Sequence, residues 1–350
     1  MNNDPQSAAW LEALKQGVVI PALPLALRSD LQIDQTAQER LIRYYIASGA
    51  GGLAVGVHTT QFEIRDPAFN LLEPILKMAA AEINRHPQSA GFIKVAGICG
   101  PTEQAVQEAQ LAVKYGYHIG LVSMGGLADY SEEALLERTK AIAAIIPVFG
   151  FYLQPAVGGR VLSYSFWSAM AEIPAVYAIK IAAFNRYQTL DVVRAVASST
   201  RNREISLYTG NDDNIVADLL TTYRFALNDT VVEKKFSGGL LGHWAVWTSK
   251  AVALLEMIKA CRTNPSGDYA ALLTIGAAVT DMNAVVFDAA NQFKGCIAGI
   301  HEVLRRQGLL NGIYCLNPEE VLSPGQAEEL DRIAAAYPEW TDDNFAKSIE

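Results

Sequence analysis

One lysine lies inside an apolar run and is the clearest candidate for chemistry in this chain. Lys180 is the only charged residue in residues 176–184 (VYAIKIAAF), which Pro174 and Asn185 bound. Burial of an ammonium group is costly, so such a lysine either pairs with a carboxylate or loses its proton more readily. No Asp or Glu lies in this run. A neutral buried amine is a candidate nucleophile for imine formation, and the alternative is a lysine that extends from a strand end to water.

The composition argues against several classes of partner. The chain has 350 residues, of which 51% are hydrophobic and 19% charged, with a net charge of -9. This acidity argues against nucleic acid or an anionic membrane as a partner. The four cysteines are far apart and form no CxxC or Cys/His pair, which indicates a reducing compartment and no zinc site. The polar N-terminus and the lack of an apolar run of about 18–20 residues predict a soluble cytoplasmic protein.

Apolar runs with strand and helix periodicity alternate from residue 18 to residue 260. Strands are expected at 18–27, 52–57, 93–100, 119–124, 147–153, 176–184, 205–209 and 236–241. Helices are expected between them at 34–47, 69–85, 101–116, 131–145, 164–173, 187–198 and 215–227, and then at 244–260. Eight such units in about 250 residues predict a parallel (β/α)8 TIM barrel. No GxGxxG follows the first strand, so a dinucleotide-binding sheet is not predicted.

Beyond the barrel the pattern becomes helical. Helices are expected at 269–287, 292–307 and 327–336, and the residues from 338 onward are expected to be a frayed tail. The predicted domains are therefore a barrel with a short N-terminal lead, residues 1–260, and a C-terminal helical extension, residues 261–350.

The C-terminal ends of the strands carry the active site in a TIM barrel, and this rule selects the candidate residues. They are His58, Thr59, Thr60, Tyr152, Gln154, Lys180, Gly210, Asn211, Asp212, Asp213, Ser237, Gly238, Gly239 and His243. Tyr152 and Lys180 are one unit apart, so we expect their side chains to converge. A phenol beside an amine can move the protons that imine formation requires.

Each of these residues also has a structural interpretation. Tyr152 could be a core aromatic with a bonded hydroxyl, and Thr59 and Thr60 could form an ordinary turn. Asp212 and Asp213 resemble a metal pair but are equally suited to helix capping. No third ligand stands at a recognisable spacing, so no metal is predicted.

Four short stretches in order carry a family resemblance: GVHTT at 56–60, FYLQP at 151–155, AIKIA at 178–182 and YTGND at 208–212. With them, residues 17–312 resemble the dihydrodipicolinate synthase / N-acetylneuraminate lyase family of Schiff-base aldolases. The resemblance implies that Lys180 forms an imine with a 2-keto acid, usually pyruvate, and that Tyr152 relays protons. It also implies that Thr59 joins this relay and that Thr60 holds the carboxylate.

The resemblance extends to the other substrate contacts and to the assembly. His58, Gly210 and Asn211 are expected to contact the substrate. The imine chemistry requires no cofactor. A homo-oligomer, either a dimer or a tetramer, is implied.

The chain also departs from the family pattern. Gln61 stands where the family has a glycine, and Ile181 replaces the acid after the lysine. Glycines follow the strand at 119–124 where synthases have a relay tyrosine, so Tyr130 is the remaining candidate. Arg160 is displaced by three positions from the family's arginine. We therefore predict a keto-acid lyase whose second substrate, an aldehyde or a sugar acid, differs from that of the synthase. The alternatives are a dehydratase of a deoxy-keto sugar acid and a non-catalytic barrel that binds a keto acid.

Overall fold

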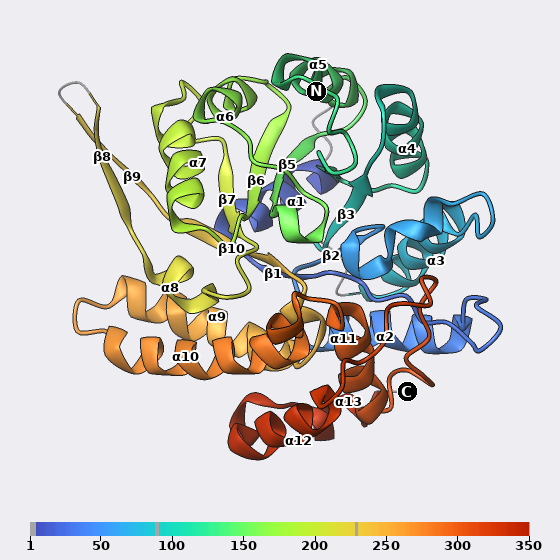
Figure 1. Cartoon of the computed structure of the whole chain (residues 1–350). Helices are drawn as coiled ribbons and strands as arrows, with labels where there is room; N and C mark the ends of the chain where they lie inside the picture. Colours follow the sequence, from blue (N-terminus) through green and yellow to red (C-terminus); the bar gives the residue numbers. More distant parts are fainter. Residues whose placement is uncertain (1–4, 88–90, 228–229, 350) are drawn as a thin grey trace.

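Eight parallel strands form the predicted barrel (Figure 1). The structure, a computed structural model of the chain, describes residues 5–87, 91–227 and 230–349. The strands pair in the order β1, β10, β7, β6, β5, β4, β3, β2, and a bridge between Ala22 and Ala54 joins the two ends. Their bounds are β1 Val19–Pro21, β2 Gly52–Val55, β3 Ile93–Ile98, β4 Ile119–Val122, β5 Val148–Leu153, β6 Val176–Ala182, β7 Ser206–Thr209 and β10 Phe236–Leu241. The (β/α)8 TIM barrel is confirmed.

Helices surround the barrel, and α2, α5, α6 and α7 begin at residues whose side chains cap them. The side chains of Asp34, Ser131, Ser163 and Asn185 accept backbone N–H groups in the first turns of α2, α5, α6 and α7. The surrounding helices are α2 Gln35–Ala47, α3 Leu72–Asn84, α4 Thr102–Lys114, α5 Glu132–Ala143, α6 Tyr164–Ala171, α7 Arg186–Ser198, α8 Ile215–Leu220 and α9 Thr248–Thr263. Helices α2 to α7 each return the chain to the N-terminal end of the next parallel strand, α8 leads through a further segment to β10, and α9 leads to the C-terminal helices.

The core consists of two shells because successive side chains of a strand point to opposite faces. Alternate residues such as Phe149, Phe151 and Tyr208 fill the inside of the barrel. The residues between them, such as Tyr152 and Ile181, pack against the surrounding helices. Helix α1 (Pro5–Gln16) contributes Trp10 and Leu14 to the inner shell and thereby closes its N-terminal end.

The prediction of one helix over residues 215–227 is wrong. Helix α8 ends at Leu220, and β8 (Tyr223–Leu227) pairs antiparallel with β9 (Thr230–Lys234). Tyr223, Phe225 and Leu227 alternate with more exposed residues at the period of a strand, and this alternation marks the hairpin. The hairpin extends from the barrel along α7 (Figure 1).

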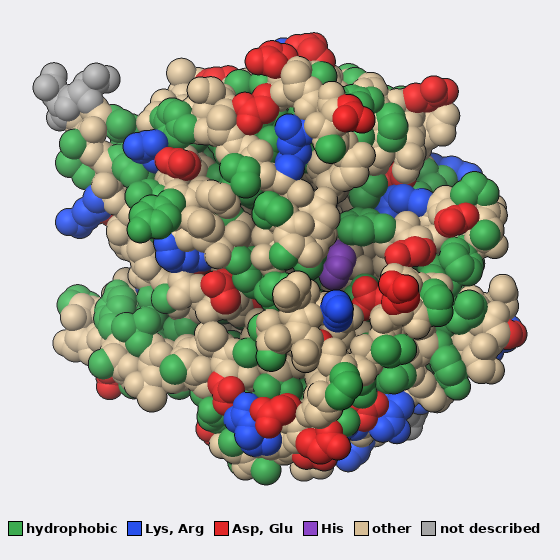
Figure 2. All heavy atoms as spheres, viewed as in Figure 1, with side chains coloured by type: hydrophobic (Ala, Val, Ile, Leu, Met, Phe, Trp, Pro, Cys, Tyr) green, Lys and Arg blue, Asp and Glu red, His purple; other side chains and the backbone are tan. Residues whose placement is uncertain are grey.

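The C-terminal helices pack against one side of the barrel. They are α10 Tyr269–Val286, α11 Cys296–Arg306, α12 Gln326–Ala336 and α13 Asp343–Ala346. The prediction of a frayed tail from residue 338 is wrong, because Asp342 is buried and accepts hydrogen bonds from Tyr44, Ser249 and Gln307. Acidic and basic side chains are interspersed over α12 and across the face shown in Figure 2.

Helix α10 contradicts the expectation that no apolar run reaches the length of a membrane span. It has 18 residues with a mean hydropathy of 1.4, which satisfies the length and composition of a span. Its residues Leu272, Val279, Met282 and Val286 are buried in the core of this fold. Core helices of water-soluble proteins meet the same criteria, so length and composition alone do not assign α10 to a membrane.

Candidate active site

Lys180 lies in the second half of β6 with its side chain inside the barrel. It is in register with Phe151 on β5 and with Tyr208 on β7, both of which belong to the inner shell. The residue is only 8% exposed, and its Nζ lies 4.5 Å from the centroid of the Phe151 ring. This position satisfies the predicted burial of the lysine, and the ring face offers a weak cation–π contact to its charged form.

Gly210 follows β7 and leaves the space that the lysine side chain occupies. A Cβ at this position would lie 2.5 Å from Lys180 Cε and 2.9 Å from Ala182 Cβ. The backbone N–H of Gly210 donates to the carbonyl of Ile181 at 2.7 Å, which holds the two strand ends together. Gly210 lines the cavity, and the close approach of Lys180 explains why a glycine suits the position. Its contact with a substrate stays a prediction.

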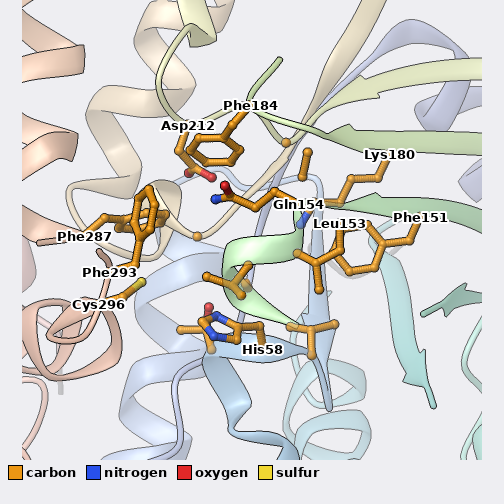
Figure 3. A pocket seen from close by; sticks show the side chains of 17 residues that line it. His58, Phe151, Leu153, Gln154, Lys180, Phe184, Asp212, Phe287, Phe293 and Cys296 are labelled. Carbon is orange, nitrogen blue, oxygen red and sulfur yellow. The ribbon is translucent and has the colours of Figure 1, made fainter. Parts of the chain in front are cut away.

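A cavity opens at this end of the barrel and contains about 550 Å³ of space, including its solvent-exposed mouth. Figure 3 shows its lining side chains, which come from the strand ends and from the C-terminal segment. The polar ones are His58, Thr59, Gln154, Lys180 and Asp212; the others are Ala22, Val57, Phe151, Leu153, Val157, Ala182, Phe184, Gly210, Gly242, Phe287, Phe293 and Cys296.

Asp212 is the carboxylate that the lysine run itself lacks. It is buried after β7, and its Oδ1 accepts a hydrogen bond from the His243 backbone N–H at 2.9 Å. Burial lowers the pKa of Lys180 to about 8, although the nearby Asp212 acts to raise it. Burial raises the pKa of Asp212 to about 7, opposed by the His243 N–H and by Lys180. Burial thus favours the neutral form of each group, while their attraction favours the charged forms.

His58 and Thr59 enter the cavity from the short 3-10 helix His58–Thr60 that follows β2. Burial, and secondarily the charge of Lys180, lowers the pKa of His58 to about 4. The imidazole is therefore neutral at physiological pH and can donate or accept a hydrogen bond. Both residues lie where the sequence predicted them, at the same end of the barrel as Lys180.

Thr60 and Asn211 do not line this cavity, contrary to their predicted contact with the substrate. The Thr60 hydroxyl donates to the Leu23 carbonyl at 2.7 Å and accepts from the Gly56 N–H at 3.0 Å. Asn211 accepts from the Phe184 N–H and donates to Asp218. Through these hydrogen bonds, the Thr60 and Asn211 side chains hold the loops that border the cavity in place.

The expected convergence of Tyr152 and Lys180 is wrong. Tyr152 is in register with Ile181, and its ring stacks on Trp167 outside the barrel at 5.3 Å between centroids. Its hydroxyl accepts from the Leu162 N–H at 3.4 Å. The β5–β6 register shifts between Val148 and Phe149, and this irregularity places Phe151 beside the lysine. Spacing along the chain could not reveal a register shift between two strands.

Arg160 and Tyr130, the candidates for the family's arginine and relay tyrosine, also lie outside the cavity. The Arg160 guanidinium donates to the backbone carbonyls of Leu127 and Tyr130. Tyr130 is partly buried and packs against the outer shell. Within residues 5–87, 91–227 and 230–349, neither a tyrosine nor an arginine lines the cavity.

Sequence reasoning assigned no role to several lining residues. Asp212 had a signal, since it follows a strand at the active end, but its proximity to Asp213 suggested capping or metal binding instead. Phe287, Phe293 and Cys296 lie more than 100 positions after Lys180, in the region predicted as a C-terminal helical extension. The sequence contains no signal that these residues line the barrel cavity.

Comparisons with known proteins agree with this fold. The model of the "Dihydrodipicolinate synthetase family" matches residues 15–223. N-acetylneuraminate lyase of Citrobacter koseri is 26% identical over 207 residues, which are 58% of this chain and 65% of that lyase. Dihydrodipicolinate synthase from Oceanobacillus iheyensis superposes with a TM-score of 0.74 at 16% identity, over 94% of this chain and 99% of the synthase. The pyruvate complex of N-acetylneuraminate lyase from Fusobacterium nucleatum superposes with a TM-score of 0.72 at 16% identity, over 95% of this chain and 99% of that lyase.

Proposed function

We infer, because this chain belongs to the dihydrodipicolinate synthetase family, that it is a class I aldolase-type lyase that binds a 2-keto acid such as pyruvate as an imine on Lys180. The observation that carries this proposal is the placement of Lys180. Its amine is buried in a cavity at the C-terminal end of a TIM barrel, and its pKa is lowered to about 8. A lysine with this pKa has an appreciable neutral fraction near physiological pH, and the neutral amine is the nucleophile.

A lowered pKa alone does not identify the nucleophile. Burial also lowers the pKa of Lys234 to about 8, but its Nζ donates to the backbone carbonyls of Asn202 and Ile205. Lys94 is buried on β3, and its Nζ donates to Asn84 Oδ1 at 2.8 Å. Lys180 differs from both because its amine lines a cavity together with a carboxylate and a neutral histidine.

The proposed reaction begins with attack of the Lys180 amine on the keto carbon of the substrate. The resulting carbinolamine loses its hydroxyl as water when a proton is supplied, and the product is the imine. The protonated imine accepts the electron pair of an adjacent bond and becomes an enamine. This electron sink makes a metal or an organic cofactor unnecessary for the proposed step.

Asp212 is the residue that we propose for proton transfer, in place of Tyr152. Its carboxyl group lines the cavity, and its pKa of about 7 allows it both to give and to take a proton. Among the cavity-lining residues in the described part of the chain, only Thr59 carries a hydroxyl group, and we assign it to the substrate carboxylate. His58, held neutral, can donate a hydrogen bond to a substrate oxygen.

Borohydride reduction in the presence of pyruvate tests the proposal. Wild-type protein should gain the mass of one reduced pyruvate adduct, and peptide mapping should place it on Lys180. Lys180→Ala should abolish the adduct, whereas Lys94→Ala, which removes another buried strand lysine, should leave it in place. The proposal fails if folded wild-type protein gains no adduct while a known imine-forming aldolase is trapped in parallel.

A further inference from the structure

The end of the cavity opposite Lys180 is lined by aromatic rings. In Figure 3, Phe287, Phe293 and Cys296 lie on the other side of the cavity from Lys180 and Phe151. Phe184 comes from the turn after β6, and its ring meets the Phe293 ring edge-to-face with 6.0 Å between centroids. Three phenylalanines from two distant parts of the chain therefore surround one end of the space that Lys180 faces.

The backbone holds two of these rings in place through unusual conformations. Phe184 has a φ of 50° and Phe293 a φ of 66°, positive backbone angles that residues other than glycine rarely adopt. The Phe184 N–H donates to Asn211 Oδ1 at 2.9 Å. Asp288 receives hydrogen bonds from Gly295 and Asn291 within the loop that carries Phe293. A strained backbone conformation persists only when surrounding contacts hold it, as these hydrogen bonds do. We therefore infer that the aromatic rings already have this arrangement before a substrate binds.

Polar side chains also line the cavity. In Figure 3, Asp212 and the Gln154 amide lie beside the Phe184 ring, and His58 lies on another wall of the cavity. A substrate bound to Lys180 would thus place its reacting oxygen among polar groups and its remaining substituent among the rings. Hydroxyl groups placed there would lose their hydrogen bonds to water, at about 1–3 kcal/mol each. An aromatic substituent would instead bury its whole surface against preformed rings.

We propose that the second substrate of this site is an aldehyde with an aromatic substituent, which binds against Phe184, Phe287 and Phe293. This inference rests on the proposed function. The Lys180–pyruvate imine would lose a methyl proton to the Asp212 carboxylate and form an enamine. The enamine carbon would then attack the aldehyde carbon, and Asp212 would return the proton to the aldehyde oxygen. Water would hydrolyse the new imine, so that pyruvate and the aldehyde combine into one aryl hydroxy keto acid.

Condensation of pyruvate with benzaldehyde or with glyceraldehyde tests the substrate class. We expect kcat/KM for benzaldehyde to exceed that for glyceraldehyde by at least about tenfold, since the site would have to bury the hydroxyl groups of glyceraldehyde. Equal values, or a preference for glyceraldehyde, in protein that still forms the borohydride-trapped pyruvate adduct would overturn the aromatic substrate and leave the proposed function standing. Absence of the adduct would overturn both.

A variant of the aromatic end locates the effect. Phe293→Ala should lower kcat/KM for benzaldehyde by about tenfold and should lower kcat/KM for glyceraldehyde much less, because the removed ring would contact the aromatic substituent. Phe293→Leu retains more of the side-chain volume than Phe293→Ala, so its kcat/KM for benzaldehyde should fall less. Phe69→Ala removes another partly buried phenylalanine, outside this cavity, and should not change kcat/KM. Equal losses in Phe293→Ala and Phe69→Ala would contradict the assignment.

Discussion

At the scale of single residues, the site depends on a lysine and a carboxylate whose ionisation burial opposes. Lys180 and Asp212 are both buried, and burial disfavours the charged form of each. Their mutual attraction favours the charged forms and only partly offsets this effect. The pKa of the lysine therefore falls and that of the carboxyl group rises, so both groups titrate near neutral pH.

This pair predicts the pH dependence of imine formation. The trapping rate with pyruvate should rise with pH through about 8, since only the neutral Lys180 amine attacks. In Asp212→Asn the charge that raises the lysine pKa is gone, so the midpoint of this rise should move to lower pH. Initial rates of adduct formation at a series of pH values measure both midpoints. An unchanged or higher midpoint in the variant would show that the two groups do not interact as described.

At the scale of elements, the pairing of β5 with β6 decides which aromatic residue accompanies the lysine. Phe151 pairs with Lys180, and both face the barrel interior. The next pair along the strands, Tyr152 and Ile181, faces the surrounding helices. A shift of one residue turns a strand's side chains to the opposite face. The Tyr152 hydroxyl therefore contacts the backbone before α6 instead of the substrate.

This register predicts that the Tyr152 hydroxyl is dispensable for chemistry. Tyr152→Phe should retain kcat within about threefold, whereas loss of the proton-transfer group in Asp212→Asn should lower kcat about 100- to 10,000-fold. The free energy of unfolding should fall by about 1 kcal/mol in Tyr152→Phe, because the Leu162 N–H loses its acceptor. Steady-state assays and urea unfolding separate the two effects. If Tyr152→Phe loses as much activity as Asp212→Asn, Tyr152 reaches the substrate after all.

At the scale of the whole molecule, the barrel and the C-terminal helices form one site. Phe287, Phe293 and Cys296 come from the C-terminal segment and line the same cavity as Lys180. The residues that line the cavity therefore come from both sides of the predicted boundary between residues 1–260 and 261–350. The homo-oligomer and the cytoplasmic location implied by the sequence remain predictions.

Asp342 joins the end of the chain to the barrel. Its Oδ2 accepts from the Tyr44 hydroxyl at 2.9 Å and from Ser249 Oγ at 2.8 Å, and its Oδ1 accepts from Gln307 Nε2 at 2.8 Å. Asp342→Ala should lower the free energy of unfolding by about 2–4 kcal/mol, because it leaves buried donors without an acceptor. Asp331→Ala, which removes a mostly exposed partner of Arg306, should cost less than about 1 kcal/mol. Denaturant unfolding measures both, and equal costs would indicate that the tail contributes no buried network.

Much of the fold follows from periodicity in the sequence. Apolar runs at strand and helix spacing located eight strands and most of the helices, because burial of one face imposes its repeat on the chain. Residues 223–227 are an exception: their alternation is present in the sequence, but the predicted helix over 215–227 included them. The docked tail was also missed, since its polar residues find their partners more than 30 positions away.

The sequence alone was enough to predict that Lys180 lies in a barrel strand near its C-terminal end, because the apolar run around it has the length and composition of a buried strand. It also determined that His58 and Thr59 accompany the lysine, since parallel strands all end on one face. The three-dimensional fold was needed to show that Asp212 shares the cavity with the lysine, that Phe151 lies beside it, and that phenylalanines from the C-terminal segment line the same cavity. These facts depend on the register between strands and on contacts between distant segments, which spacing along one chain does not contain.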